Sequence, residues 1–437
     1  MSPLLLVWLV LATGTLGQAL LLTLQTYEHR RFARSRLRNG RTTPMNMRVR
    51  LLAPCKGIDV GLADNLRPLL EQDYTNYEVV FLVESAEDSA CETIRRLMTE
   101  STRVPVRLLV SGKASDTGQK VHNLLAGTVD LPSEVEILAF VDSDARPHSA
   151  WLRFLVQRLD NGQAAAATGY RWFVPTRPSL ANYIQYAINA CAAVMYRADS
   201  RGLVWGGSWA IRRDKFEACG LRAAWQGTLS DDLVASRVLR AARMRVEFEP
   251  ACMLPSPLEL SFSQMLEFLR RQYVIGRTYA LRTWCIGFAA IVTTAAAFWG
   301  GLLAALYGAA SDASWTWIPA SFCLAWYALN VGRGYMRRAT ARTYFGDRFV
   351  ALRGATLFDA WCAPLTGLVN AAMMLSAAVG SHITWRGNSY RIYQGGRIRL
   401  LTGPPKLDLP HGVRIDQAQE VFDMFHAQPR QQLKKFL

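Results

Sequence analysis

The sequence predicts an α/β domain with a parallel, doubly wound sheet, joined to transmembrane α-helices. Three observations support this fold class. Short apolar runs alternate with helical stretches between residues 48 and 258, which is typical of βαβ units. Long uncharged runs lie before and after this region, and basic residues flank those runs. Membrane-spanning helices have this pattern because arginine and lysine collect on the cytoplasmic side of a bilayer.

The composition agrees with a membrane protein that carries one soluble domain. The chain has 437 residues, is 51% hydrophobic and has a net charge of +16. Arginines beside apolar spans explain the charge, since the anionic inner leaflet attracts them. No signature of an RNA- or DNA-binding module is present, so nucleic acid is not an expected partner. The eight cysteines are scattered without a CxxC pair, which favours reduced thiols facing the cytosol.

The first element is an N-terminal transmembrane anchor, predicted over residues 1–27. Pro3–Gln25 is apolar and long enough to cross a hydrocarbon core of about 30 Å. A signal peptide is the alternative, because Gly17–Ala19 resembles a cleavage site. However, no basic residue precedes the apolar run, and many follow it. The positive-inside rule then places everything after Thr26 in the cytoplasm.

The soluble region contains the alternating strands and helices of the predicted sheet. The expected strands are Val49–Ala53, Glu78–Val83, Val106–Val110 and Ile137–Val141, with later strands at Gln163–Phe173 and Met244–Glu249. The expected helices between them are Asp64–Glu71, Ala90–Thr99, Lys120–Thr128 and Ser149–Leu159. Ligands of such sheets bind beyond the carboxyl ends of the strands, so the residues there are the first candidates for a site.

Two carboxylates follow the apolar run Ile137–Val141 directly. Asp142 and Asp144 stand at the predicted strand end and repel each other, so they need a cation between them. Hard oxygen ligands that leave room for phosphate oxygens suit Mg²⁺ or Mn²⁺. The alternative is an Asp-rich turn in which Asp144 caps the following helix. A D-x-D pair by itself does not distinguish the two.

The C-terminal part predicts membrane elements. Residues 259–284 mix apolar and cationic positions, which predicts an amphipathic helix in the membrane interface. Cys285–Gly308 and Ala313–Val331 are uncharged spans joined by an acidic connection, which belongs outside. The arginine-rich stretch Arg333–Arg353 belongs inside. Residues 354–380 contain Asp359, Pro364 and Asn370, so we expect a bent, re-entrant or interfacial element there.

A series of motifs resembles the ceramide glucosyltransferases, in the same order and over about residues 48–400. The motifs begin with a short loop after the first strand and end in the tail. They are Pro54–Asp59, Asn65-Leu66, Asp73-Tyr74, Tyr77–Val79, Lys120–Leu124, Asp142–Asp144, Trp205–Ser208, Arg212–Asp214, Ser230–Leu233, Thr384–Gly387, Tyr390 and Gly395-Gly396. The resemblance implies a membrane-bound, inverting glycosyltransferase with a GT-A fold.

The resemblance also implies the reaction and its domains. A UDP-sugar, with glucose as the first choice, would give its sugar to the hydroxyl of a membrane lipid such as ceramide. Mn²⁺ or Mg²⁺ on Asp142 and Asp144 would neutralise the leaving diphosphate. The implied domains are an anchor (1–27), a cytosolic catalytic domain (48–258), an interfacial helix (259–284), membrane segments (285–380) and a basic tail (381–437).

Further donor-site residues are expected from the same motifs. The resemblance places an acidic residue for the nucleotide base after the second strand, where Glu84 stands, although Ser85 and Asp88 leave the register open. Lys120 and Asn123 share a helical face, and the lysine suits a phosphate. Surface positions are the alternative for these residues. Gly206 and Gly207 allow close backbone approach to a substrate, or form an ordinary turn.

Inversion needs one general base on the acceptor side. In Ser230-Asp231-Asp232 the second acid matches the base position of the relatives, so we expect Asp232 as the base and Asp231 as its support. The same residues also suit a helix N-terminus. One motif departs from the family: Arg271 fits its first position, but Val274-Ile275 stands where Arg-Trp is expected. This departure affects the acceptor more than the donor.

Three other classes of protein compete with a lipid glycosyltransferase as interpretations of this sequence. A processive polysaccharide synthase needs a channel, for which the predicted membrane segments are few. A phosphotransferase needs its Asp pair on the first strand. A non-catalytic scaffold conflicts with intact acidic motifs. We expect an integral protein of the inner or cell membrane, if bacterial, with no obligate protein partner. Other UDP-sugars, and diacylglycerol or polyprenol acceptors, stay open.

Overall fold

The structure is a computed structural model that describes residues 3–39, 45–59, 61–100, 103–160, 162–197 and 203–402. It divides into two compact units. The sheet unit comprises residues 32–176, 196–257 and 381–437, and the helical unit comprises residues 1–31, 177–195 and 258–380. The predicted tail beyond residue 402 lies outside the described residues.

A seven-stranded sheet forms the core of the sheet unit, in the order β3-β2-β1-β4-β6-β5-β7. β1 (Val49–Pro54), β2 (Tyr77–Val83), β3 (Val106–Val110) and β4 (Ile137–Val141) pair in parallel. They match the four predicted strands within one residue, because each is a short apolar run that is buried or partly buried. The prediction of an α/β fold is confirmed.

The second half of this sheet differs from the predicted parallel arrangement. β6 (Ser208–Arg212), a strand that was not predicted, pairs antiparallel with both β4 and β5 (Ala166–Pro175). β7 runs from Val246 to Leu258 and is longer than the predicted strand. β6 is a short run directly after a glycine pair, so its length and composition do not distinguish a strand from a turn in the sequence.

The first three helices of the sheet unit alternate with the parallel strands, and the others follow β4 and β6. They are α2 (Leu62–Leu70), α3 (Ala90–Glu100), α4 (Gln119–Gly127), α5 (Trp151–Gln157), α7 (Arg213–Ala218), α8 (Leu221–Trp225) and α9 (Asp231–Ala241). Aromatic packing fixes the end of β4. Phe140 stacks on Trp209 of β6 at 4.3 Å, and Trp225 packs edge-on against Phe140 at 5.7 Å. This cluster holds the strand that leads into Asp142.

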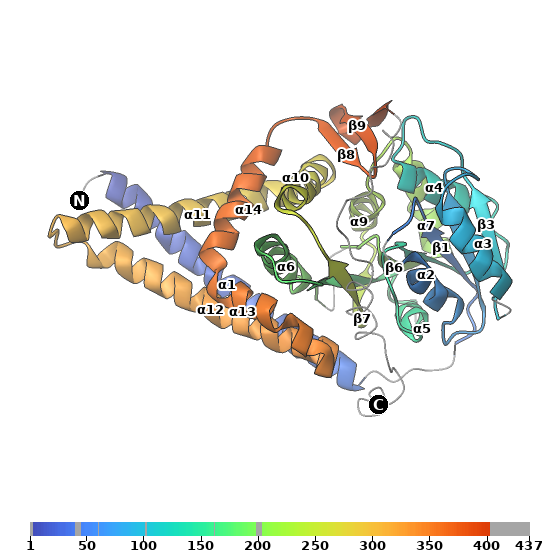
Figure 1. Ribbon diagram of the computed structural model, residues 1–437, viewed down its shortest axis with the longest axis horizontal. Helices are drawn as coiled ribbons and strands as arrows, with labels where there is room; N and C mark the ends of the chain where they lie inside the picture. Colours follow the sequence, from blue (N-terminus) through green and yellow to red (C-terminus); the bar gives the residue numbers. More distant parts are fainter. Residues whose placement is uncertain are drawn as a thin grey trace. The chain divides into compact units, whose positions relative to one another are not determined.

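The C-terminal segment forms a small three-stranded sheet within the sheet unit. It contains β8 (His382–Trp385), β9 (Asn388–Ile392), the short 3₁₀ helix η2 (Gln394–Gly396) and β10 (Ile398–Thr402). Figure 1 shows β8 and β9 in red near α4, and the backbone N–H of Gln119 in α4 donates to the Tyr390 hydroxyl at 3.4 Å. The tail is therefore part of the sheet unit.

The helical unit contains the long apolar helices. Its elements are most of α1 (Pro3–Asn39), α6 (Leu180–Ala193), α10 (Phe262–Tyr279), α11 (Leu281–Ala310), α12 (Trp317–Phe345), η1 (Gly346–Leu352), α13 (Arg353–Trp361) and α14 (Ala363–Ala377). Figure 1 shows α1, α11 and α12 side by side, and the Trp8 indole N–H donates to the Ala297 carbonyl at 3.1 Å. Their apolar faces thus pack within this unit.

Two of the described helices, Leu5–Arg38 and Leu281–Ala310, are long and apolar enough to cross a membrane. Most of the predicted span Ala313–Val331 lies in α12, which begins at Trp317 and counts as a candidate membrane span only together with α13 and α14. That pair bends by 80° at Cys362, just before Pro364. Asp359 does not face lipid, because Arg337 holds it with two hydrogen bonds of 2.8 Å inside the unit.

Candidate active site

The candidate site begins where β4 ends. Asp142, Ser143 and Asp144 follow Val141 directly, as the sequence predicted. The Asp142 and Asp144 carboxylates are only partly exposed. Burial raises the pKa of Asp144, and the neighbouring Asp142 charge raises it further. The two carboxylates therefore repel each other and favour a positive partner.

Lys120 of α4 supplies one such partner. Its Nζ lies 2.6 Å from Asp142 Oδ1 and 3.1 Å from Asp231 Oδ1. Burial alone would lower the pKa of Lys120, but the nearby carboxylates outweigh burial and raise it. Burial likewise opposes ionisation of Asp142, and the charge of Lys120 outweighs it, so the pKa of Asp142 is lowered. Lys120 is thus a cation that bridges Asp142 and Asp231.

The predicted catalytic pair stands at the start of α9. Ser230 caps this helix by accepting from the Leu233 N–H. Asp232 is partly exposed; its Oδ1 accepts from the Ser230 hydroxyl at 2.6 Å, and its Oδ2 accepts from the Gly206 N–H at 3.2 Å. The helix N-terminus and the predicted catalytic pair are therefore the same residues, Ser230 to Asp232.

Asp231 differs from its neighbour because it is buried, with 2% of its surface exposed. Burial raises the pKa of Asp231 to about 6, and the Asp232 charge adds to this while Lys120 opposes it. Its Oδ2 has no hydrogen-bond partner among the described residues. The structure thus gives the two adjacent acids different environments.

Glycine is required at both positions of the predicted pair, for different reasons. A Cβ at Gly206 would lie 2.6 Å from Asp231 Oδ2 and 2.8 Å from Lys120 Nζ. A Cβ at Gly207 would lie 2.3 Å from the Trp205 ring. Gly206 therefore leaves room for Asp231 and Lys120, whereas Gly207 leaves room for the Trp205 ring.

The remaining predicted residues lie outside this cluster. Glu84 follows β2 and pairs with Lys56 at 2.7 Å. Asn123 is buried, and it bonds Ser111, Gln119 and the Leu82 carbonyl, so it supports the strand ends from behind. Arg271 belongs to α10 in the helical unit, where its guanidinium lies 5.2 Å from the Phe268 ring centroid. Its expected part in donor binding stays a prediction.

Two arginines and an aspartate were missing from the predicted site. The charges of Arg171 of β5 and Arg386 of the tail add to the lowering of the pKa of Asp142, and they oppose the burial that raises the pKa of Asp144. Arg386 also donates to the Lys56 carbonyl at 2.9 Å and pairs with Asp59 at 3.1 Å. The tail motif was the signal for Arg386 and the first loop for Asp59. A charge within an apolar strand was the sole signal for Arg171.

The donor set fits a cation that arrives with a phosphorylated ligand. Among the described residues no group of three histidine, cysteine or acidic side chains converges. Asp142 and Asp144 offer two mutually repelling carboxylates, and Mg²⁺ is commonly bound by one or two carboxylates together with substrate phosphates. These two residues would therefore hold Mg²⁺ or Mn²⁺, with phosphate oxygens completing the coordination.

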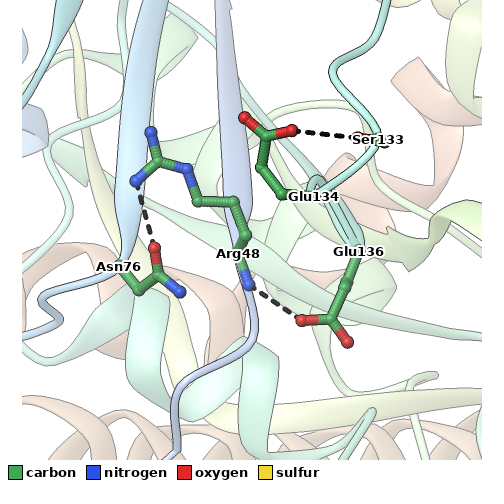
Figure 2. Close-up of a pocket in the computed structure, with 5 residues that line it drawn as sticks. All are labelled: Arg48, Asn76, Ser133, Glu134 and Glu136. Carbon is green, nitrogen blue, oxygen red and sulfur yellow. Dashed lines mark hydrogen bonds between the residues drawn. The ribbon is translucent and has the colours of Figure 1, made fainter.

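A pocket of about 500 Å³ lies at the opposite, amino-terminal end of the parallel strands of this sheet. Arg48, Asn76 and Glu136 line it, and each precedes a parallel strand. In Figure 2 the Arg48 N–H donates to Glu136 and the Arg48 guanidinium donates to Asn76. Ligands of open α/β sheets bind at the carboxyl ends of the strands, so this pocket is distinct from the candidate active site.

Comparison with known proteins places the chain among sugar-transferring enzymes. The model of glycosyl transferase family 21 matches residues 9–398. Ceramide glucosyltransferase 1 of Caenorhabditis elegans is 29% identical over 77 residues, which are 18% of this chain and 16% of that protein. Ceramide glucosyltransferase 3 of the same organism is 27% identical over 77 residues, 18% of this chain and 17% of that protein. The matched stretch thus spans about a sixth of these curated relatives.

Solved structures show more distant likenesses. The mannosyltransferase PcManGT from Pyrobaculum calidifontis, in complex with GDP-Man and Mn²⁺, has a TM-score of 0.42 at 16% identity and covers 83% of this chain and 97% of its own. GalNAc-T7 with UDP, GalNAc and Mn²⁺ has a TM-score of 0.37 at 9% identity and covers 54% of this chain and 49% of its own. Scores this low assign neither a fold nor a ligand.

Proposed function

The chain belongs to glycosyl transferase family 21, and from this premise we propose that it glycosylates a membrane lipid. The donor is a UDP-sugar, UDP-glucose in the first instance, and the acceptor is the hydroxyl of a lipid such as ceramide. One observation carries the proposal: Asp142 and Asp231, one from each of the two predicted acidic pairs, both contact Lys120, and Asp142 follows the carboxyl end of β4. Transfer with inversion needs both pairs in one site.

Asp232 serves as the general base in this proposal. An inverting single displacement removes one proton from the acceptor hydroxyl as it attacks the sugar carbon. Asp232 is partly exposed; its Oδ1 accepts from the Ser230 hydroxyl and the Leu233 N–H, whereas its Oδ2 accepts from the Gly206 N–H alone, so Oδ2 is the oxygen proposed to take the proton. Asp231 is buried and paired with Lys120, so its proposed role is support. These contrasting environments support this division of roles.

The leaving diphosphate requires positive charge. Lys120 lies within the site, and Arg171 and Arg386 act on Asp142 and Asp144 through their charge. When bound between these two carboxylates, Mn²⁺ or Mg²⁺ supplies Lewis-acid stabilisation of the diphosphate. Glu84, at the end of β2, is the proposed contact of the nucleotide base, and Lys56 fixes its orientation at 2.7 Å.

The proposed location is the cytosolic face of a membrane. Two helices are long and apolar enough to cross a bilayer, and the basic residues that follow the first favour a cytoplasmic sheet unit. The tail packs within the sheet unit through Arg386 and Asp59, so the tail and the catalytic domain share one side. UDP-sugars and a lipid substrate meet at such a surface.

A transfer assay tests the function. Purified protein in detergent is incubated with Mn²⁺, one labelled UDP-sugar and one lipid acceptor, with Asp142→Asn as the control. We expect a single-sugar lipid product from ceramide with wild-type protein and none with the variant. Polymeric product would favour a polysaccharide synthase instead. The proposal would be rejected if no combination of UDP-sugar and lipid gave a glycolipid in the assay and none appeared in lipid extracts of expressing cells.

A further inference from the structure

We propose that the tail, residues 381–402, is a working part of the active site, and that Arg386 is its positioning residue. Arg386 acts through Asp59 on the loop that carries Asp142 and Asp144. This inference rests on the proposed function, because it concerns the site for the UDP-sugar. It adds a role for Arg386, which lies 242 residues beyond Asp144 in the chain.

A chain of hydrogen bonds connects the tail to the metal motif. Both terminal nitrogens of Arg386 donate to Asp59 Oδ2 at 3.2 Å. The same Oδ2 accepts from the Ser143 hydroxyl at 2.7 Å. Ser143 stands between the two candidate metal ligands, so its position determines where both carboxylates lie. Arg386 therefore holds the acceptor of the bond that anchors this loop.

The same turn also reaches the nucleotide side of the site. Arg386 Nη1 donates to the Lys56 carbonyl at 2.9 Å, and the Lys56 ammonium pairs with Glu84 at 2.7 Å. Moving Arg386 would thus affect two loops, the one after β1 that carries Lys56 and Asp59 and the one after β2. The second loop carries Glu84, the proposed contact of the nucleotide base.

Other parts of the tail contact two further active-site segments. Tyr390 accepts from the Gln119 N–H, directly before Lys120. The Ile398 N–H donates to the Gly227 carbonyl at 3.1 Å, four residues before Asp231. The Leu400 N–H donates to the Ser115 carbonyl at 3.1 Å, in the loop before α4. The tail therefore contacts the segments that lead into α4, which carries Lys120, and into α9, which begins with Asp231.

The β8–β9 hairpin fixes the backbone of Arg386. Trp385 pairs with Asn388, so Arg386 and Gly387 form a two-residue turn, and their φ values are 46° and 77°. Such hairpin turns require a positive φ at both central residues, so the hairpin itself accounts for this conformation. The rigid turn presents the Arg386 side chain, and its bonds to Asp59 and the Lys56 carbonyl hold it in place.

Arg386→Ala, Asp59→Asn and the double variant test the proposal in the full-length protein. The measurements are UDP affinity by calorimetry with Mn²⁺ present, and KM and kcat for the UDP-sugar. Hydrogen bonds to charged groups are typically worth a factor of about 10–100, so we expect each single variant to weaken UDP binding by about that factor. Because both residues act along one chain of bonds, the double variant should lose little more than either single variant.

Two further variants separate positioning from general stability. Arg386→Lys retains the charge and should recover part of the lost affinity. Arg391→Ala changes an exposed arginine of the neighbouring strand β9 and should leave UDP affinity unchanged. Thermal unfolding of every variant is measured, and Arg386→Ala and Asp59→Asn should unfold near the wild-type temperature.

Several outcomes would overturn the proposal. Unchanged UDP affinity in Arg386→Ala would show that the tail does not position the site. Multiplicative losses in the double variant would show that Arg386 acts independently of Asp59, for example by contacting the diphosphate directly. An equal loss in Arg391→Ala would point to general destabilisation. Failure of wild-type protein to glycosylate lipid rejects the proposed function instead, and UDP affinity still decides the role of Arg386.

Discussion

At the scale of single residues, the site depends on unequal environments for similar side chains. Asp231 and Asp232 are adjacent in the sequence, yet one is buried beside Lys120 and the other is partly exposed at the start of α9. Asp142 and Asp144 are likewise close in sequence, yet the pKa of Asp142 is lowered beside Lys120 and that of Asp144 is raised. One lysine accounts for much of this difference, because it contacts one member of each pair.

The base assignment can be tested at this scale. Asp232→Asn retains the shape of the side chain and removes its ability to accept a proton. Transfer should fall by about 10²–10⁴-fold while UDP-sugar binding stays near normal, because a base acts on the acceptor and not on the donor. Asp231→Asn should have a milder effect on the rate, since its proposed role is support. Steady-state kinetics and donor binding measure both. A larger loss of transfer rate in Asp231→Asn than in Asp232→Asn would identify Asp231 as the base instead.

The metal requirement is a second prediction for single residues. Asp144→Ala removes one of two proposed ligands, so it should abolish transfer and weaken Mn²⁺-dependent UDP binding. The fold should persist, as circular dichroism would record. Excess chelator should have the same effect on wild-type protein, and full activity in chelator would contradict this expectation.

The raised pKa of Asp231 predicts a dependence of stability on pH. Since the pKa of Asp231 is raised to about 6, the folded state retains its proton between about pH 4 and pH 6, where the unfolded chain has lost it. The free energy of unfolding attributable to this group therefore falls as pH rises through that window. The free energy of unfolding of Asp231→Asn, relative to that of wild type, should therefore rise by up to about 3 kcal/mol from pH 4 to pH 7.

Denaturant titrations at both pH values measure this gain. Asn at position 231 also loses its ion pair with Lys120, which shifts the stability of the variant at both pH values. The informative quantity is thus the change in the difference between variant and wild type. A difference that is constant from pH 4 to pH 7 would mean that Asp231 titrates as an exposed carboxylate does.

At the scale of elements, close helix packing organises the helical unit. α12 and α13 contact each other at Gly334, where an added Cβ would lie 2.3 Å from the Cα of Ala360. The neighbouring residue of α13, Asp359, is held by Arg337 of α12 with two hydrogen bonds. A buried ion pair fixes the register of two helices when both charges are satisfied in one arrangement only.

Gly334→Ala tests the importance of this contact, and Gly332→Ala is its control. An alanine at Gly332 meets nothing within 4 Å, so it should be neutral or slightly stabilising through its better helix propensity. An alanine at Gly334 must push against the backbone of α13, and overpacking of this kind costs about 1–3 kcal/mol. Thermal unfolding in detergent compares the two. Equal unfolding temperatures would show that α12 and α13 adjust to the methyl group without loss of stability.

At the scale of the whole molecule, the order of the membrane elements along the chain determines on which side of the membrane each soluble part lies. The acidic connection near Asp312 is predicted outside, and the sheet unit with its tail is predicted inside. Because the tail belongs to the same unit as the seven-stranded sheet, both must be on one side. The bend at Cys362 between α13 and α14 is where the chain returns toward the tail, and a re-entrant element there is the prediction that keeps the tail inside.

Labelling of single cysteines tests this topology. In a background with Cys285→Ser, which removes an exposed thiol, Asp312→Cys, Glu92→Cys and Gln394→Cys are made one at a time at exposed positions. An impermeant maleimide added to intact cells should label only Asp312→Cys. The other two should react after permeabilisation. Labelling of Gln394→Cys from outside would separate the tail from the catalytic domain and contradict its packing beside Asp59.

The sequence by itself determined the parallel strands, the acids at their ends and the apolar helices. These features depend on local patterns: a run such as Ile137–Val141 is apolar because it is buried, and the next residue marks the strand end. Only the tertiary structure decided the antiparallel strand β6, the place of Lys120 between two carboxylates, and the contact of Arg386 with Asp59. The last pair is 327 residues apart in the chain. Hydrophobic periodicity carries no information about such distant partners, because packing of the folded units alone brings them together.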